Sequence, residues 1–371
     1  MRLGTYNVES MFQRAKAMNL DTWAQGRWVL EDFARLNTLI QEVTYTEATK
    51  AELLTIMKER HKALLTQGKT RFLELRDIRR QFLKKSKGKP TAIGVGGRRD
   101  WIGWFELVKE PLKETATENT ARVIGLVKAD VLCVIEAEDR VGLKRFNEDV
   151  LAKVGVEPFK HVMLIDGNDD RGIDVGVMCR AGHEISRIQS HVDDVDGQGE
   201  IFSRDCAEYE IRTPAGNRLL LLVNHFKSKG YGPPKKSDAK RLRQATRVRA
   251  IYDERLGQGY EYVAVVGDLN ETPDRAPLAP LTGEGSTLTD IMAHPKFAGD
   301  GKPGTWDTAA KSGKFDYILM SPKLSAKVVT GGVERHGVWA GAKGDMFEHL
   351  PMETKADAGS DHAALWVTLD L

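Results

Sequence analysis

The chain ends in the stretch GSDHAALWVTLDL, residues 359–371. Gly359 and Ser360 favour a turn, and the residues after His362 form an apolar run that is typical of a strand buried on both faces. Asp361 and His362 therefore stand side by side at the mouth of a buried strand. A turn alone can account for an Asp-His pair. Whether the Asp-His pair has a functional role depends on whether the rest of the chain supplies partners for it.

Six further apolar runs of similar length occur along the chain. They are LGTYNV (3–8), DVLCVIE (130–136), IDVGVMC (173–179), LLLLVNHF (219–226), EYVAVVGDLN (261–270) and FDYILMS (315–321). An Arg-rich segment at about residues 237–255 has the composition of a helix and lies between the fourth and fifth of these runs. Strands interspersed with helices indicate an α/β or α+β sheet protein.

Length and composition bound the fold further. With 371 residues the chain is longer than one hydrophobic core usually grows, so one large domain with an insertion and two smaller domains are both possible. The apolar fraction is 41% and the charged fraction 29%, as in soluble globular proteins. No window approaches the roughly 18 to 20 apolar residues of a membrane span. Because no apolar leader precedes the first strand, a cytoplasmic location is expected.

Charge is distributed unevenly although the net charge is only +2. Residues 50–100 hold 15 Lys and Arg against 5 Asp and Glu, a local +10, while the remainder holds 40 against 48. Apolar residues at three- and four-residue steps predict helices at about 28–43, 47–65 and 70–85, with a break at Gln67-Gly68. We therefore predict a single domain over 1–371 with a basic, mainly helical insertion over 20–115. Its charge suits either a solvated helix face or an arm that binds a polyanion.

Polar side chains stand where the predicted strands end. If these strands share one sheet edge, their side chains converge, because ligand sites in α/β proteins form beyond the carboxyl ends of strands. The set contains carboxylates, amides and histidine, without a nucleophilic Ser or Cys beside a base and without a GxxxxGK[ST] phosphate loop. The residues are Asn7, Glu136, Asn224, His225, Asp268, Asn270 and Asp316.

This inventory suits metal-assisted attack on a phosphoester. Carboxylate and amide oxygens are ligands for Mg2+ or Mn2+. Such an ion polarises a phosphoryl oxygen, while amides donate hydrogen bonds to the developing charge and a histidine oriented by an aspartate handles a proton. Asp361 and His362 then have a possible role.

Seven motifs in a fixed order carry a resemblance to a known family. They are TYNVES, LCVIEAEDR, RGIDVGVM, LVNHFKSKG, VVGDLNETP, FDYIL and GSDHAAL. The series resembles that of the endonuclease/exonuclease/phosphatase (DNase I-like) superfamily over the whole chain except about residues 20–115. The resemblance implies a four-layer αββα sandwich of two mixed β-sheets. The predicted helical insertion interrupts this pattern after the first strand. It also implies a hydrolase that depends on Mg2+ or Mn2+.

The resemblance further implies roles for individual residues near the metal. Glu136 matches the principal metal-binding carboxylate, and Asn7 matches an amide that helps to hold the metal or its water. Asp361 matches an acidic residue near the metal that is sometimes a ligand.

Five other residues match positions that carry the reaction. His362 matches the catalytic histidine, with Asp316 as the carboxylate that orients it. Asp268 matches the acid that positions the attacking water or a metal, and Asn270 matches the amide that binds the scissile phosphate. His225 falls where DNase I-like and sphingomyelinase-like members carry a histidine near the leaving group.

Further residues are candidates for substrate contacts, and each also has a structural explanation. Arg171 can bind a substrate phosphate or pair with a neighbouring Asp, and Lys227 can bind phosphate or lie on the surface. Asn224 is predicted to contact substrate from the end of its strand. Trp101 and Trp104 can stack on bases or pack in the core.

The superfamily serves several substrates, so the fold does not select one. The basic insertion, the Arg-rich helix and the motif NHFKSKG favour a nuclease acting on DNA or RNA. The motif resembles secreted bacterial nucleases, whereas a signal peptide is not seen. The alternatives are a phosphatase or phosphodiesterase for a lipid or sugar phosphate, and a non-catalytic binding scaffold. The sequence leaves strandedness, endo or exo cleavage, the number of metals and the oligomeric state open.

Overall fold

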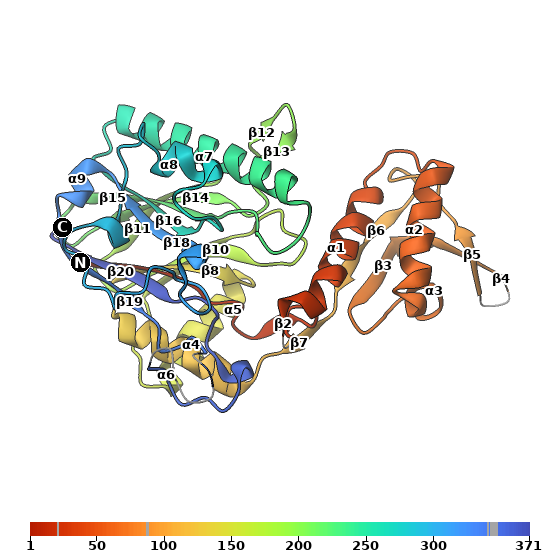
Figure 1. The fold of residues 1–371 in the computed structure, drawn as a ribbon, viewed down its shortest axis with the longest axis horizontal. Coiled ribbons are helices and arrows are strands. Elements are labelled where there is room, and N and C mark those ends of the chain that lie inside the picture. The colour runs from red at the N-terminus through yellow and green to blue at the C-terminus, as the bar shows by residue number, and fades with distance from the viewer. Residues whose placement is uncertain (21, 87–88, 340, 342–347) are drawn as a thin grey trace. The chain divides into compact units, whose positions relative to one another are not determined.

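The chain divides into two compact units in the computed structural model (Figure 1), which describes residues 1–20, 22–86, 89–339, 341 and 348–371. Unit 1 comprises Met1–Phe12, Leu112–Lys229 and Pro233–Leu371. Unit 2 comprises Gln13–Pro111 together with Gly230–Gly232. Unit 2 is therefore inserted into unit 1 directly after the first strand.

Two six-stranded mixed sheets form the centre of unit 1. The first has the order β19 (Val328–Glu334), β20 (Ala364–Leu369), β1 (Arg2–Asn7), β8 (Val131–Ala137), β10 (Asp174–Cys179) and β9 (His161–Ile165). The second has the order β11 (Glu184–Gln189), β14 (Cys206–Arg212), β15 (Arg218–His225), β16 (Tyr262–Asp268), β18 (Asp316–Met320) and β17 (Thr289–Asp290). In each sheet one pair is parallel, β1 with β8 and β15 with β16, and the other pairs are antiparallel.

Helices cover the outer faces of the two sheets. Figure 1 shows α7 and α8 on one side of the sheets and α4 and α6 on the other. The helical segments of unit 1 are α4 (Glu114–Val127), α5 (Arg140–Arg145), η1 (Phe146–Val150), α6 (Leu151–Lys153), α7 (Pro234–Gly257), η2 (Ala276–Leu278), α8 (Ala279–Thr282), η3 (Ile291–Ala293), η4 (Lys311–Gly313), α9 (Pro322–Ser325) and η5 (Lys355–Asp357). A short hairpin of β12 (Val195–Asp196) and β13 (Gly199–Glu200) completes this unit.

Three apolar clusters hold these layers together. One joins inward-facing residues of both sheets, such as Ile135 and Val177 with Leu221 and Val266. A second lies between the first sheet and α4 to α6, and a third lies between the second sheet and α7. Each sheet is thus buried on both faces, which is why its central strands read as near-continuous apolar runs. The expected four-layer αββα sandwich is confirmed.

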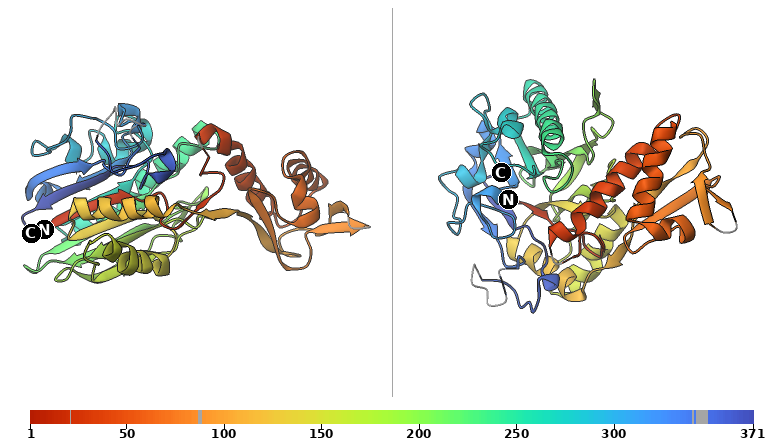
Figure 2. Two further views of the ribbon diagram at one scale, coloured as in Figure 1. Left: turned by 90° about the horizontal axis from the view of Figure 1, so that it is seen from below. Right: turned by 45° about the vertical axis from the view of Figure 1, so that its right-hand side comes forward.

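The seven strands expected from apolar runs are all present, as β1, β8, β10, β15, β16, β18 and β20. The two termini lie side by side (Figure 2), because β1 pairs with β20 and the Met1 amine donates to the carbonyl of Leu369 at 2.7 Å. No helix among the described residues is both long enough and apolar enough to cross a membrane.

Unit 2 has a hydrophobic core of its own. Its elements are β2 (Gln13–Ala15), α1 (Trp23–Leu39), α2 (Glu47–Glu59), α3 (Lys62–Gln67), β3 (Leu73–Arg79), β4 (Leu83–Ser86), β5 (Lys89–Ile93), β6 (Ile102–Leu107) and β7 (Lys109–Pro111). The strands pair as β2 with β7, β3 with β6 and β4 with β5. Leu36, Leu53, Phe82 and Trp101 are buried at its centre.

The helix expected over residues 70–85 is wrong, because β3 and β4 occupy this segment. The three-residue spacing of apolar residues is misleading here, since Ile78 is 64% exposed. Leu73 and Leu75 instead alternate along a strand that pairs with β6, so tertiary pairing overrides the local pattern. Unit 2 is a mixed α and β unit rather than a mainly helical insertion.

The other two predicted helices exist with shifted ends. The expected helix at 28–43 is α1, which begins and ends earlier. The expected helix at 47–65 is split into α2 and α3, with His61 as the residue that caps α3. The predicted break at Gln67-Gly68 is confirmed, because Gly68 ends α3 with a left-handed φ of 75°.

Candidate active site

The topology of unit 1 gathers polar side chains at one end of the two sheets. Asn7 ends β1, and Glu136 lies at the end of the parallel strand β8. His225 ends β15 and lies opposite Asp268, which ends the parallel strand β16. Asp316 begins β18, where antiparallel pairing sets it opposite Asp268. Hence the strand ends of both sheets meet, as the sequence predicts.

Side chains from the two sheets come within contact distance here. The Asn7 amide donates to Asp268 Oδ2 at 3.2 Å. Nε2 of His225 lies 3.4 Å from Glu136 Oε1 and 3.6 Å from Asp268 Oδ2. Glu136 adopts a left-handed φ of 66°, which is strained for a residue with a side chain. The backbone at Glu136 therefore maintains a costly conformation at the point where its carboxylate meets the other sheet.

Asp268 is the central carboxylate of this group. The backbone N–H of Asn270 donates to its Oδ1 at 2.8 Å, and the Asn270 amide donates to its Oδ2 at 3.0 Å. Burial raises the pKa of Asp268 to about 7, with the cation of His362 opposing this rise and Asp316 adding to it. Asn270 itself has a left-handed φ of 51°, which turns the chain back toward the carboxylate that precedes it.

His362 and Asp316 form a buried pair. Nδ1 of His362 lies 2.8 Å from Asp316 Oδ2, and the Thr305 hydroxyl donates to the same oxygen at 2.6 Å. Nε2 of His362 is left facing Asp268 Oδ2 at 3.9 Å and Asp361 Oδ1 at 3.7 Å. Burial alone would lower the pKa of His362, but Asp316, Asp361 and Asp268 together outweigh it and raise this pKa well above its usual value.

Asp361 lies at the rim of the group. Its Oδ2 accepts a hydrogen bond from the indole N–H of Trp306 at 2.7 Å, and its backbone N–H donates to Glu9 Oε2 at 3.1 Å. Trp306 is 36% exposed. Sequence reasoning missed Trp306 and Thr305, because both lie in a loop outside the seven motifs and carry no periodic signal.

The two histidines of the group have opposite electrostatic environments. Burial lowers the pKa of His225 well below its usual value, and the nearby cations Arg204 and Arg171 lower it further. His362 is surrounded by carboxylates instead. Paired titratable groups whose environments move their pKa values apart are typical of acid-base sites. These environments therefore favour the neutral form of His225 and the protonated form of His362.

A cationic group lies next to His225 in the chain and in space. The guanidinium of Arg171 donates to both oxygens of Asp169, at 3.0 and 2.8 Å for the shortest contacts. Arg204 shares Asp169 at 3.0 Å and donates to the carbonyl of Phe226 at 2.8 Å. Burial, together with Arg171 and Arg204, lowers the pKa of Lys227 to about 7. Arg171 and Lys227 are thus brought together by the fold, and Arg204 is a third member that the sequence did not reveal.

Asn224 is not brought to this group. Adjacent residues of a strand point to opposite faces, so Asn224 and His225 diverge. Asn224 is fully buried, lies opposite Cys206 of the neighbouring strand, and donates its amide to the carbonyl of Leu222 at 2.9 Å. Its geometry is that of a structural residue in the layer beneath α7.

The arginines of α7 have carboxylate partners. Arg255 donates to both oxygens of the buried Glu208 at 2.6 and 2.7 Å. The remaining partners, at 2.5 to 3.1 Å, are Glu271 for Arg241, Asp196 for Arg243, Asp194 for Arg247 and Asp253 for Arg249. This helix therefore uses its arginines to attach itself to unit 1. The arginines of this helix therefore do not by themselves support a polyanion site.

Two groups of described side chains could hold a metal ion. They are Glu136, His225 and Asp268, and Asp268, Asp316 and His362, each with ligand atoms within 4.8 Å of one another. The first set fits a hard divalent cation, because two buried carboxylates face each other across it and the Asn7 amide lies beside them. Asp316 is already held by His362 and Thr305, which makes the second set a histidine-orienting group.

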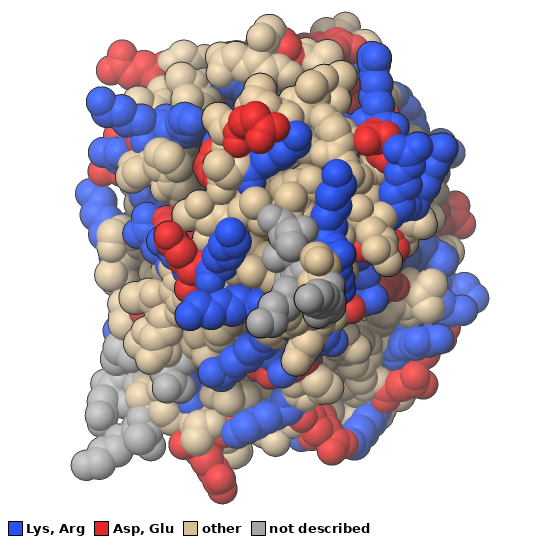
Figure 3. Space-filling model, turned by 90° about the vertical axis from the view of Figure 1, so that its right-hand side faces the viewer, with Lys and Arg blue, Asp and Glu red and all other residues tan. Residues whose placement is uncertain are grey.

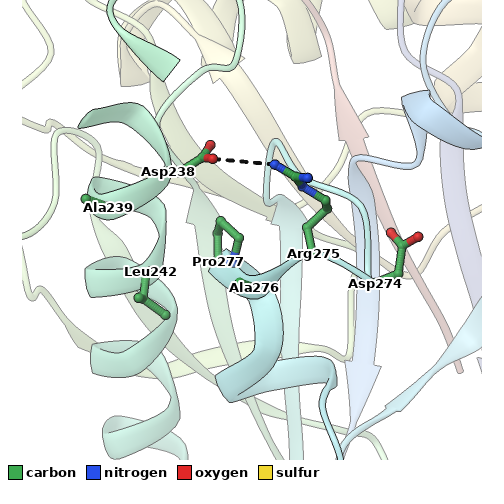
Figure 4. Close-up of a pocket in the computed structure, with 7 residues that line it drawn as sticks. All are labelled: Asp238, Ala239, Leu242, Asp274, Arg275, Ala276 and Pro277. Atoms are coloured by element: carbon green, nitrogen blue, oxygen red, sulfur yellow. Dashed lines mark ion pairs between the residues drawn. The ribbon is translucent and has the colours of Figure 1, made fainter. Parts of the chain in front are cut away.

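A separate shallow pocket lies between α7 and the segment that leads into η2 (Figure 4). It is lined by Asp238, Ala239, Leu242, Asp274, Arg275, Ala276 and Pro277. An Asp238 carboxylate oxygen lies 3.5 Å from the Arg275 guanidinium at this pocket. None of these residues belongs to the strand-end group described above.

The fold is that of the four-layer αββα phosphoesterases. Residues 105–287 match the model of the Endonuclease/Exonuclease/phosphatase family. Over this segment, which is just under half of its length, the chain is similar to members of this family.

Solved structures with the same fold include an endonuclease/exonuclease/phosphatase family protein from Bacteroides thetaiotaomicron. It is 17% identical with a TM-score of 0.50, over 68% of this chain and 86% of that one. A mannosyl-6-phosphatase from the same organism is 17% identical with a TM-score of 0.49, over 69% and 92%. Truncated TDP2 from Caenorhabditis elegans is 18% identical with a TM-score of 0.48, over 69% and 90%. A search of curated protein sequences found no match.

Proposed function

We propose that this protein is a divalent-metal-dependent phosphodiesterase that cleaves nucleic acid. The observation that carries this proposal is the His362–Asp316 pair, whose free Nε2 faces Asp268 beside Glu136. A histidine oriented by a buried aspartate and aimed at a carboxylate group is the arrangement that proton transfer at a phosphoester requires.

Glu136 and Asp268 would hold the metal, with Asn7 beside them. Mg2+ or Mn2+ suits these oxygen donors. When bound, such an ion polarises a phosphoryl oxygen and offsets the charge of the leaving oxygen. The charge of two buried carboxylates supports this assignment, since burial of such a pair without a cation is costly.

The side chains supply the remaining chemistry. Protonated His362 donates from Nε2 to an oxygen of the phosphate, and Asp316 fixes the ring for this by accepting from Nδ1. Asp268 orients the attacking water and accepts its proton. Asn270 holds the scissile phosphate through its amide, and neutral His225 contacts the leaving group.

Arg171 and Lys227, together with Arg204, bind a phosphate of the substrate next to the reacting one. Arg171 and Arg204 both bind Asp169, and the same two cations lower the pKa of Lys227 to about 7, so three basic side chains gather in this corner of the site. Such a group suits a substrate phosphate.

Charge distribution favours nucleic acid over a lipid or sugar phosphate. Residues 13–111 hold 20 Lys and Arg against 12 Asp and Glu, a net charge of +8, whereas the rest of the chain carries −6. Clustered cations bind polyanions by releasing condensed counterions. A small monophosphate does not require a basic surface of this extent for binding.

One panel of substrates tests the proposal. Full-length protein with Mg2+ or Mn2+ is offered plasmid, single-stranded DNA, RNA, bis-p-nitrophenyl phosphate and p-nitrophenyl phosphate. We expect cleavage of at least one polynucleotide and of the small diester, with loss of both on chelation. Turnover of p-nitrophenyl phosphate alone would favour a phosphatase, and no turnover of any ester would favour a binding scaffold.

A further inference from the structure

Strands β3 and β6 of unit 2 form a two-stranded ribbon with one outward face. Cross-strand pairs set Glu74 opposite Glu106, Arg76 opposite Trp104 and Arg79 opposite Ile102. Along β6 these residues alternate with the buried Gly103, Phe105 and Leu107, so the paired residues share the outward face. We call these six outward residues the outer ribbon face.

Two tryptophans three positions apart have opposite surroundings. Trp101 is fully buried, packs on Phe82 at 4.6 Å between ring centroids, and donates its indole N–H to Asp77 Oδ1 at 2.7 Å. Trp104 is 40% exposed, and its indole N–H donates to Glu106 Oε1 at 2.7 Å. A Cβ on Gly103 would lie 2.2 Å from the Arg76 carbonyl and 2.3 Å from the Trp101 ring, so the ribbon backbone rests directly on Trp101. Trp104 is therefore displayed on a rigid support.

Apolar and cationic side chains flank Trp104. Ile102 is 44% exposed on the same face. Arg79 and Arg99 are exposed, and no carboxylate among the described residues pairs with either. Arg76, in contrast, is held by Glu74 and Glu106 at 2.9 Å each. Arg79 lies opposite Ile102, the first residue of β6, and Arg99 precedes this strand in the chain. Figure 3 shows Lys and Arg side chains spread over the face that is turned toward the viewer.

We propose that the outer ribbon face, together with Arg99 from the segment before β6, binds unpaired nucleotides of single-stranded nucleic acid, with a base stacked on Trp104 and phosphates at Arg79 and Arg99. This assignment rests on the proposed function, because it names the substrate class of the phosphodiesterase. An exposed aromatic ring beside cations is the recurrent platform for single strands, since only unpaired bases expose a face for stacking. The net charge of +8 on residues 13–111 selects a polyanion over a neutral partner.

Binding is tested in the full chain, with Glu136→Gln as background and EDTA present, so that cleavage does not interfere. Affinity for a labelled 20-nucleotide single strand and for the matching duplex is measured by fluorescence anisotropy. Trp104→Ala should weaken single-strand binding about 5- to 100-fold, which is the loss of one stacked base. Trp104→Phe should retain most of the affinity, and duplex binding should change less than 3-fold.

Intrinsic fluorescence locates the contact. The chain has 7 tryptophans, so a change in total fluorescence does not by itself identify the ring. If the single strand quenches the fluorescence of the background protein but not that of Trp104→Ala, the quenching is assigned to Trp104. Because Trp104 is partly exposed, an unchanged thermal melting curve is the expected control for folding.

Charge is tested with matched pairs of substitutions. The double variant Arg79→Gln/Arg99→Gln should reduce the logarithmic salt slope of single-strand binding by up to about 1.4, or about 0.7 per lost phosphate contact. Lys58→Gln/Lys62→Gln removes the same charge from exposed positions on α2 and α3, and should change the slope by less than half as much.

Several results would overturn the assignment. Equal affinity of Trp104→Ala and the background protein for the single strand excludes stacking. If Trp104→Ala loses affinity for the duplex and for the single strand equally, a site for unpaired bases is excluded. Equal effects of the two double variants exclude a localised phosphate contact and favour another partner for this face.

The assignment and the proposed function can fail separately. Turnover of bis-p-nitrophenyl phosphate is measured with Glu136 intact. Absence of turnover together with Trp104-dependent single-strand binding would refute the phosphodiesterase and keep the binding face. Turnover without Trp104-dependent binding would refute the binding face and keep the phosphodiesterase.

Discussion

The strand-end group of unit 1 and the outer ribbon face of unit 2 use ionisable residues in opposite ways. At the strand ends, Asp268, Asp316 and His362 are buried, with His362 Nδ1 2.8 Å from Asp316 Oδ2 and its Nε2 3.9 Å from Asp268 Oδ2. On the ribbon, Arg79 is exposed and without a carboxylate partner among the described residues, and Trp104 is partly exposed. Burial shifts pKa values and fixes geometry, which suits chemistry, whereas exposure leaves charge available, which suits attachment.

The same contrast separates two sets of arginines. Arg243 and Arg247 of α7 are paired with Asp196 and Asp194. Arg79 and Arg99 lack such partners within the described part of the chain. A count of charges in the sequence treats both sets alike. The difference teaches that local partners, and not the number of arginines, decide whether a basic segment can bind a polyanion.

The largest effect should come from the metal-binding carboxylate. Glu136→Gln removes one charge from the proposed ligand set, so turnover should fall about 10³- to 10⁵-fold, corresponding to several kcal/mol of transition-state stabilisation. Calorimetry should show loss of Mn2+ binding, and single-strand affinity should stay within about 3-fold. Glu184→Gln, on the exposed edge strand β11, is the matched control and should keep full activity. Unchanged Mn2+ affinity would remove Glu136 from the metal site.

The next largest effect concerns the proton. His362→Ala should lower turnover about 10²- to 10⁴-fold, the usual contribution of general acid–base catalysis. Asp316→Asn should lower it less, because the histidine remains but loses its orienting carboxylate. His294→Ala, at a half-buried position outside the strand-end group, serves as control.

The double variant His362→Ala/Asp316→Asn sharpens this prediction. Residues that act as a unit give non-additive losses, so the double variant should be little worse than His362→Ala alone. A loss equal to the sum of the two single losses, in free energy, would contradict a paired role.

A smaller effect should appear in the pH dependence of substrate binding. Lys227 has a pKa of about 7, so it is cationic below this pH and neutral above it. KM for bis-p-nitrophenyl phosphate, whose charge is constant in this range, should rise by up to about 10-fold between pH 6 and pH 8. Lys227→Arg keeps its charge and should flatten this rise. The same rise in Lys227→Arg would assign the titration to another group.

The smallest effect should come from the paired arginines. Arg243→Gln/Arg247→Gln should change single-strand affinity less than 2-fold and stability by no more than about 1 kcal/mol per pair, because exposed or partly exposed ion pairs contribute little. Anisotropy and thermal unfolding of the full chain provide both values. A loss of single-strand affinity as large as that of Arg79→Gln/Arg99→Gln would contradict the distinction between paired and unpaired arginines.

Much of unit 1 can be predicted from the sequence because buried strands leave long apolar runs. The same runs locate the site, since polar residues that interrupt an apolar run at its end stand out, as Glu136 and Asp268 do. The order of the motifs then indicates the family that the chain resembles.

Other parts of the site leave no signal in the sequence. Thr305 and Arg204 lie in loops, and their roles depend on contacts with Asp316 and Asp169 that only the folded chain forms. Asn224 shows a second reason why the site could not be fully predicted from the sequence. It stands at a strand end like its neighbour His225, but strand alternation sends only one of the two toward the site.

Unit 2 was harder to predict for a physical reason. Its strands are short and half exposed, so their apolar residues are too few to establish a two-residue period. The spacing of Phe72, Leu75 and Ile78 then imitates a helix, whereas pairing with β6 determines the fold. The burial of Trp101 and the exposure of Trp104 also depend on this pairing.

The separation of chemistry from attachment is the central claim, and one paired measurement tests it most directly. Turnover of bis-p-nitrophenyl phosphate and affinity for a 20-nucleotide single strand are measured in the same full-length preparations of Glu136→Gln and of Trp104→Ala/Arg79→Gln/Arg99→Gln. The account predicts that the first variant loses turnover and keeps affinity, while the second keeps turnover within about 2-fold and loses affinity at least 10-fold. Loss of small-diester turnover in the ribbon variant, with its fold intact, would contradict it.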